Sequence, residues 1–178
     1  MNYFEVFGLP KRLNLDLKEL ERTFHELSRK SHPDYFTNAP SADRQRALQM
    51  TATLNDAYRT LRHPVRRVEH LLAVEGFKPD GSKVPKSFLM EVFEINEQLE
   101  EVKSGAANKD QIEALRREIE SRAQEFESQV QTASAEWDRL EADGASEAQR
   151  KQHLSRLTEI LSESSYIRNL QRELEEKS

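Results

Sequence analysis

The sequence contains no cysteine among its 178 residues. This absence excludes a disulfide framework, and it excludes a zinc ion or an iron–sulfur cluster held by the chain's own thiolates. Only five residues are glycine, and charged residues make up 33% of the chain against 36% apolar residues. No apolar run approaches the ~18 residues of a membrane-spanning helix, and the first residues lack a basic segment followed by an apolar stretch. We therefore expect a helix-rich, cytoplasmic protein without a membrane partner.

The chain has fewer basic than acidic residues, and the difference is distributed unevenly along the sequence. The formal net charge is −5. Residues 1–75 hold 12 Lys or Arg and 10 Asp or Glu, whereas residues 76–178 hold 15 and 22. Nucleic acid is not expected as a partner, because its binding needs a strong basic patch. The opposite signs of the two parts suggest two different protein partners.

A His32-Pro33-Asp34 tripeptide follows a helix predicted over about residues 17–31. Pro33 has no backbone N–H and moves His32 out of the α region, so the helix ends here and Asp34 falls in a loop. One face of the helix is apolar, and the face about 160° around the axis is basic. The apolar face consists of Leu17, Leu20, Phe24 and Leu27, and the basic face of Lys18, Arg22, His25 and Arg29.

A second amphipathic helix follows this loop and ends at His63-Pro64. The two helices can pair antiparallel with the tripeptide at their connection. A basic helix face alone is more often only a solvated face. The whole order of helix, basic outer face, His-Pro-Asp loop and second helix is more specific, and it resembles a J-domain, the module that stimulates ATP hydrolysis by DnaK-type chaperones.

Two other runs are more specific than the tripeptide. Residues 3–10 read Tyr-Phe-Glu-Val-Phe-Gly-Leu-Pro, and residues 61–64 read Leu-Arg-His-Pro. Both resemble the HscB family, the J-domain co-chaperones of iron–sulfur cluster assembly, in its bacterial form. General J-domain proteins carry a Gly/Phe-rich linker and zinc-binding cysteines further on, and this chain has neither.

Turn-forming residues mark a boundary after the first part of the chain. Gly76, Pro79, Gly81 and Pro85 lie within ten residues of one another. Hydrophobic periodicity beyond them predicts three helices joined by short breaks, which favours antiparallel neighbours. We therefore expect an all-α chain with a J-domain over residues 1–75, a linker over 76–86 and a three-helix bundle over 87–178.

The bundle helices are predicted over about residues 87–103, over 109–142 and from Ser146, where Gln149 completes a capping box. Heptad-like apolar spacing runs down the second of them, through Trp137, as far as Leu140. A heptad pattern is compatible with packing against a helix of the same chain or of a second copy, so a dimer through these helices is the alternative to the expected monomer.

The first bundle helix carries apolar residues that its core stripe does not need. Leu89, Met90 and Phe93 lie about 100° to 200° around the axis from that stripe, and Glu94 and Glu97 border them. An apolar patch with an acidic rim has the composition of a protein-docking surface. The alternative, which the sequence leaves open, is that the third helix or the J-domain covers these side chains.

The resemblance assigns a role to both surfaces. In the HscB family this part of the first bundle helix binds the cluster scaffold protein IscU, and residues 88–94, Phe-Leu-Met-Glu-Val-Phe-Glu, are similar to the family's binding run. The resemblance implies a co-chaperone that stimulates a DnaK- or HscA-type ATPase and delivers an IscU-type scaffold protein to it, which assists cluster transfer. The implied chaperone-binding residues are His32, Pro33, Asp34, Lys18, Arg22, His25 and Arg29, and the implied scaffold-binding residues are Leu89, Met90, Phe93, Glu94, Glu97 and Tyr166.

Catalysis is not expected, and neither is a metal site or a cofactor. Pro33 separates His32 from Asp34 in a loop, and the sequence places no nucleophile beside them. The five histidines show no metal-ligand spacing. Two other functions stay open: a J-domain co-chaperone with a different client, and a structural helical bundle in which the tripeptide is accidental.

Overall fold

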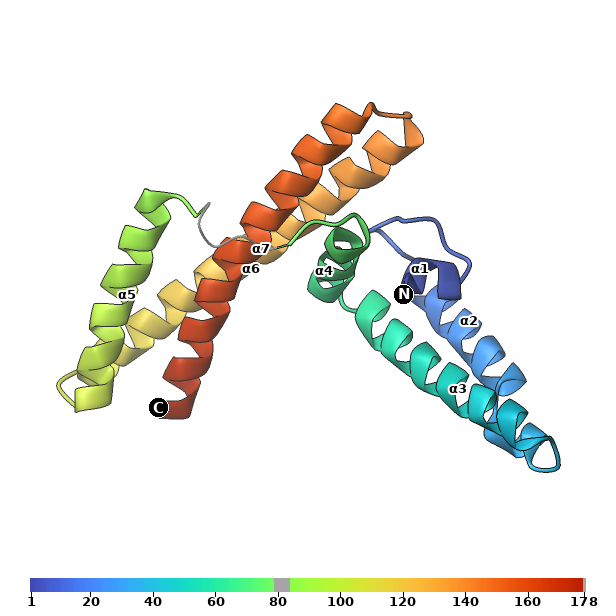
Figure 1. Cartoon of the computed structure of the whole chain (residues 1–178). Coiled ribbons are helices and arrows are strands. Elements are labelled where there is room, and N and C mark those ends of the chain that lie inside the picture. Colours follow the sequence, from blue (N-terminus) through green and yellow to red (C-terminus); the bar gives the residue numbers. More distant parts are fainter. Residues whose placement is uncertain (79–83, 178) are drawn as a thin grey trace. The chain divides into compact units, whose positions relative to one another are not determined.

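The computed structural model describes residues 1–78 and 84–177, apart from the side chains of Pro33 and Lys177. Every regular element in these ranges is helical, so the predicted all-α fold is confirmed (Figure 1). None of the helices in the described ranges combines the length and the apolar character that a membrane span requires. The elements are α1 (Tyr3–Val6), α2 (Leu17–Lys30), the 3-10 helix η1 (Pro33–Phe36), α3 (Ser41–Arg62), α4 (Pro64–Val74), α5 (Lys86–Ser104), α6 (Lys109–Ala142) and α7 (Glu147–Lys177).

The chain divides into two compact units. Unit 1 comprises residues 1–76 together with residues 134–143, which include the C-terminal turns of α6. Unit 2 comprises residues 77–133 and 144–178. Within the predicted linker, residues 79–83 lie outside the described residues. The domain boundaries predicted on either side of that linker stay a prediction.

Helices α2 and α3 form an antiparallel hairpin in unit 1 (Figure 1). Asp16 caps α2, because its side chain accepts hydrogen bonds from two backbone N–H groups of the first turn. Between the helices the rings of Phe24 and Tyr58 stack with their centroids 4.3 Å apart. Leu17 is 49% exposed, so its predicted burial is wrong. It is the first residue of α2 and lies at the margin of the apolar stripe, about 50° from the stripe's centre.

Helix α4 brings a charged side chain into the core of unit 1. Arg67 is 5% exposed, and its guanidinium donates to the carbonyl oxygens of Leu61, Arg62 and Leu13. Burial lowers the pKa of Arg67, and the carboxylate of Asp138 opposes that shift. One side chain thus joins the end of α3 to the loop that precedes α2.

The C-terminal turns of α6 complete the same core. Trp137 is fully buried, and its Nε1–H donates to the carbonyl oxygen of Lys11 at 2.8 Å. The two carboxylate oxygens of Asp138 accept the N–H groups of Leu13 and Asn14 at 2.7 and 2.8 Å. The loop before α2 is therefore held by side chains that lie about 125 residues later in the chain.

His70 of α4 packs against α1. Its ring stacks on Tyr3 with the centroids 4.4 Å apart, and its Nε2 accepts the Tyr3 N–H at 2.9 Å. A ring nitrogen that accepts a hydrogen bond is unprotonated, so this contact requires the neutral ring. Burial lowers the pKa of His70, and the positive N-terminus lowers it further.

Acidification is expected to destabilise unit 1 through His70. Its pKa is lower in the folded chain than in the unfolded chain, so the unfolded chain binds more protons. The stability that neutral His70 provides above the unfolded pKa is lost as the pH falls through the folded pKa. Urea unfolding at about pH 7.5 and about pH 5.5 brackets the ordinary histidine pKa. The His70→Gln variant, whose amide oxygen accepts the same N–H without titrating, should lose less stability than the wild type.

The exposed His25 offers the matched control for this experiment. His25→Gln should keep the pH dependence of the wild type. Should His70→Gln lose as much stability on acidification as the wild type does, His70 is not the group that titrates.

Unit 2 packs α5, residues 109–133 of α6, and α7, as the predicted bundle requires. Phe88 of α5 meets Phe126 of α6 edge-on at 5.9 Å and Tyr166 of α7 at 6.1 Å. The predicted capping box is present before α7, since Ser146 Oγ accepts the Gln149 N–H at 3.3 Å and Gln149 Oε1 accepts the Ser146 N–H at 3.0 Å. The apolar side chains with at most 1% exposure among the described residues of this unit are Ile95, Leu99, Leu115, Ile119, Ala133, Leu157 and Ile167.

Candidate functional site

The first candidate surface lies in unit 1, where α2 ends. The hydroxyl of Ser31 donates to the carbonyl oxygen of Leu27 at 2.9 Å, and the carbonyl oxygen of Ser31 accepts Thr51 Oγ1–H from α3 at 3.3 Å. Pro33 is the first residue of η1, and its side chain lies outside the described residues. His32 is extended, with φ −63° and ψ 128°, as expected of a residue before proline. The chain therefore leaves the axis of α2 at this residue.

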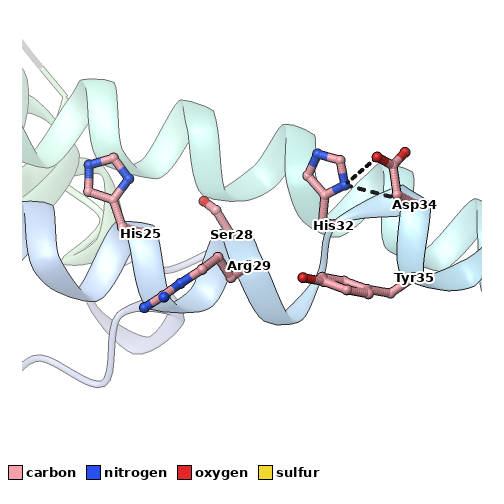
Figure 2. A pocket seen from close by; sticks show the side chains of 6 residues that line it. All are labelled: His25, Ser28, Arg29, His32, Asp34 and Tyr35. Carbon is pink, nitrogen blue, oxygen red and sulfur yellow. Dashed lines mark hydrogen bonds and ion pairs between the residues drawn. The ribbon is translucent and has the colours of Figure 1, made fainter.

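His32 and Asp34 contact each other across the intervening proline (Figure 2). The Asp34 N–H donates to His32 Nδ1 at 3.3 Å, and Asp34 Oδ2 lies 3.5 Å from the same nitrogen. The Tyr35 N–H donates to the carbonyl oxygen of His32 at 3.1 Å. The Asp34 side chain is 86% exposed, so its carboxylate stays solvated and is available to a partner.

A shallow, open depression of about 630 Å³ adjoins the tripeptide (Figure 2). The structure brings four of the predicted chaperone-binding residues together around it. Ser28 and Tyr35 also line it, and sequence reasoning missed both. The i, i+3 spacing from His25 could have indicated Ser28, since such residues share a helix face. The lining residues are His25, Ser28, Arg29, His32, Asp34 and Tyr35, and we call them the loop surface.

Lys18 and Arg22 lie on α2 but not in the loop surface. Lys18 precedes Arg29 by three turns of helix, a separation of about 16 Å at 1.5 Å per residue. Arg22 pairs with Glu19 at 3.1 Å, and both side chains are more than half exposed. Such a surface pair adds little stability. These two cations extend positive charge along α2, away from the tripeptide.

The second candidate surface lies on α5 in unit 2. Leu89, Met90 and Phe93 are 40%, 65% and 62% exposed. Glu94 and Glu97 are exposed beside them. The sequence left open whether these three apolar side chains are covered, and in the structure they are exposed. We call these five residues the docking face.

Tyr166, the sixth predicted scaffold-binding residue, contacts the buried stripe of α5 through Phe88. It is half-buried on α7, and its ring meets the buried Phe88 at an interplanar angle of 74°. This ring contact supports α5 from within the bundle. A direct role for Tyr166 in scaffold binding stays a prediction.

Sequence reasoning missed Arg122 of α6. Its guanidinium pairs with both carboxylate oxygens of Glu91 on α5 and lies 5.5 Å from the ring centroid of Phe126. The hydrogen bonds that Arg122 donates to Glu91 raise the pKa of Arg122. Burial raises the pKa of Glu163 on α7, and the charge of Arg122 opposes that shift. Helix α6 carries many charges of both signs, so its sequence held no signal for this one pair.

Both surfaces offer groups that suit contact with another protein. The loop surface presents hydrogen-bonding and charged side chains that are open to solvent. The docking face combines an exposed apolar centre with two carboxylates, the composition of an interface core and its rim.

Known proteins resemble the chain over most of its length. The family model described as the HSCB C-terminal oligomerisation domain matches residues 84–175. Co-chaperone protein HscB homologs from two Vibrio cholerae serotype O1 strains are 37% identical over 142 residues, which cover 77% of this chain and 83% of each relative. The structure of the chaperone HscB from Vibrio cholerae superposes with a TM-score of 0.70 at 30% identity, covering 99% of this chain and 96% of that one.

The crystal structure of the human co-chaperone protein HscB is also similar. Its TM-score is 0.74 over 99% of this chain and 82% of the human chain, at 23% identity. At that identity the likeness concerns the fold alone.

Proposed function

Because this chain belongs to the HscB family of co-chaperones, we propose that it stimulates ATP hydrolysis by a DnaK- or HscA-type chaperone and delivers an iron–sulfur scaffold protein to that chaperone. Its relatives are named co-chaperones, and it is a co-chaperone of iron–sulfur cluster assembly. The observation that carries the proposal is the exposure of the loop surface and of the docking face on two different units of one chain. We place this activity in the cytoplasm.

The loop surface is the proposed contact with the chaperone. Asp34 offers an exposed carboxylate, and His32 holds the backbone N–H of Asp34 in place. Arg29 adds positive charge beside them, and Lys18 and Arg22 continue it along α2. Exposed charges of this kind raise association rates and fix orientation more than they add affinity. The polar groups of the tripeptide would then make the contacts that trigger hydrolysis.

The docking face is the proposed contact with the scaffold protein. Three large apolar side chains project from α5 into solvent and form the centre of the face. Desolvated apolar anchors supply most of the binding energy of a typical interface, while a charged rim contributes orientation. Glu94 and Glu97 therefore favour a partner surface with apolar pockets and basic surroundings.

Two surfaces on one chain explain why the scaffold protein would affect the ATPase. A scaffold protein bound to unit 2 is tethered to a chaperone bound to unit 1, which raises the effective concentration of each for the other. Hydrolysis is then stimulated most when a client is present to be trapped. The chain itself has no cysteine to hold a cluster, so it would regulate transfer through protein contacts.

Changing Leu89, Met90 and Phe93 together to Ala is expected to abolish the effect of the scaffold protein. Truncation of central interface anchors costs more than about 1 kcal/mol each, so scaffold affinity should fall at least about a hundredfold. Single-turnover ATP hydrolysis by an HscA-type chaperone, with and without scaffold protein, measures the result. Stimulation by the triple variant alone should equal that of the wild type alone.

Leu48 and Met50 of α3 provide the matched control, since they are 58% and 49% exposed on the other unit. Changing both to Ala removes two exposed apolar side chains outside the docking face and should leave the scaffold effect intact. If the wild type stimulates the ATPase but ignores the scaffold protein, the chain serves a different client. If the triple variant still responds to scaffold protein, the scaffold protein binds at a surface other than the docking face.

A further inference from the structure

Among the described residues, two ion pairs join α5 to its neighbouring helices, one near each end of α5. Near the N-terminal end, Arg122 of α6 binds Glu91 in a two-pronged pair, with an Nη2–Oε2 distance of 2.6 Å. Near the C-terminal end, Lys103 Nζ lies 3.0 Å from Glu173 Oε2 of α7. Arg122 and Lys103 are similarly shielded, with side chains 26% and 27% exposed.

The two pairs lie on opposite flanks of the core stripe of α5. At 100° per residue, Glu91 lies about 70° to one side of the buried stripe and Lys103 about 50° to the other. Pairs placed in this way oppose rotation of α5 about its own axis in both directions. The two pairs also differ in position along the axis of α5. Glu91 lies within one turn of Leu89, Met90 and Phe93, whereas Lys103 lies about 15 to 20 Å further along the helix.

Arg122 supports the docking face at a second point. Its guanidinium lies over the ring of Phe126, 5.5 Å from the centroid. Phe126 in turn meets the ring of Phe88 edge-on, at an interplanar angle of 89°. Phe88 and Glu91 bound the helical turn that carries Leu89 and Met90. Arg122 therefore fixes both ends of that turn, one directly and one through an aromatic ring.

We propose that Arg122 is a positioning residue for scaffold docking, which acts by holding the turn Phe88–Glu91 so that Leu89 and Met90 point outward. This inference rests on the proposed scaffold-binding function of the docking face. Arg122 does not belong to that face. It sets the direction in which the apolar anchors point.

The charges around Arg122 show what its loss would do. Glu91 on α5, Glu125 on α6 and Glu163 on α7 all interact with its guanidinium. Burial already raises the pKa of Glu163, and the charge of Glu91 raises it further. Without Arg122 these carboxylates lose the cation that all three of them interact with, and their like charges repel. The N-terminal turns of α5 would then move away from α6 and α7, and the apolar anchors would move with them.

The test compares scaffold affinity with stability in five variants: Arg122→Gln, Glu91→Gln, the double variant, Arg122→Lys and Lys103→Gln. Titration calorimetry with purified iron–sulfur scaffold protein gives the dissociation constant, and urea unfolding gives the stability. We expect Arg122→Gln to weaken binding about tenfold. Lys103→Gln breaks the distant pair and should change binding less than about twofold.

The double variant separates positioning from direct contact. If the effect of Glu91 depends on Arg122, Glu91→Gln adds no further loss once Arg122 is gone, and the double variant binds about as weakly as Arg122→Gln alone, not about a hundredfold more weakly than the wild type. If Glu91 touches the scaffold protein independently of Arg122, the losses multiply and the inference is overturned. Arg122→Lys retains the positive charge among the three carboxylates and should bind more tightly than Arg122→Gln.

Three other results have distinct meanings. No binding by the wild type would overturn the proposed function itself. Wild-type affinity in Arg122→Gln, with binding by the wild type intact, would overturn only the positioning role. Equal losses of affinity in Arg122→Gln and Lys103→Gln at equal stability would assign the effect to general loosening of α5, which also contradicts the inference.

Discussion

Asp34→Asn is expected to reduce stimulation of the chaperone ATPase to the unstimulated rate while the fold is unchanged. The Asp34 side chain is 86% exposed and contributes no buried contact. Asparagine has nearly the same shape and keeps the backbone N–H that donates to His32 Nδ1. The change therefore removes one negative charge and its acceptor capacity, and a charged hydrogen bond to a partner contributes about 1.5–3 kcal/mol. Single-turnover ATP hydrolysis with an HscA-type chaperone measures the loss.

Asp56→Asn provides the control for charge removal from the same unit. Asp56 is 62% exposed on α3 and pairs loosely with Arg59 at 3.9 Å. This variant should stimulate like the wild type, and both variants should unfold at the same urea concentration. Full stimulation by Asp34→Asn would mean that the carboxylate of Asp34 does not trigger hydrolysis, whereas no stimulation by the wild type would favour a structural helical bundle with an accidental tripeptide.

Trp137→Ala is expected to destabilise unit 1 by about 3–5 kcal/mol, the usual cost of truncating a buried large aromatic side chain. Trp137 is fully buried and donates to the carbonyl oxygen of Lys11. Truncation leaves a cavity and removes the indole donor from that carbonyl. A whole domain is stable by only about 5–15 kcal/mol, so a large share of the stability of unit 1 depends on this residue.

Hydrogen exchange of the intact chain locates the effect. Amides of α2, α3 and α4 should exchange faster in Trp137→Ala, because they belong to the unit that Trp137 completes. Trp137→Phe keeps an aromatic ring but loses the N–H, so it should show a smaller increase. Unchanged protection of these amides in Trp137→Ala would mean that residues 134–143 do not support unit 1.

The sequence predicted those features that depend on neighbouring residues. Pro33 ends α2 by removing an N–H donor, and Ser146 with Gln149 begins α7, so both helix boundaries follow from local chemistry. The helical fold followed from periodicity for the same reason. The predicted burial of Leu17 is wrong because Leu17 lies at the edge of the apolar stripe and in the first turn of α2, where the residue on that edge is 49% exposed.

Features that depend on distant residues could not be predicted. Heptad spacing indicated a buried Trp137, but burial does not name the neighbour, and the structure gives it the carbonyl of Lys11 in unit 1. Likewise, one of many charges on α6, Arg122, selects Glu91 on another helix. The exposure of Leu89, Met90 and Phe93 depends on how the other helices pack against α5, and the hydrophobic periodicity of α5 alone does not determine that packing.

The origin of unit 1 in two separate stretches of chain has a consequence for protein synthesis. Helices α1 to α4 leave the ribosome first, but Trp137 and Asp138 follow only after the roughly 60 intervening residues, about 3 to 12 seconds later at usual elongation rates. During that interval the loop before α2 lacks the side chains that hold it. A nascent chain therefore acquires a complete unit 1 only after α5, with its docking face, has already been made. In terms of the proposed function, the order of translation delays completion of the unit proposed to contact the chaperone until the helix proposed to bind the scaffold protein exists.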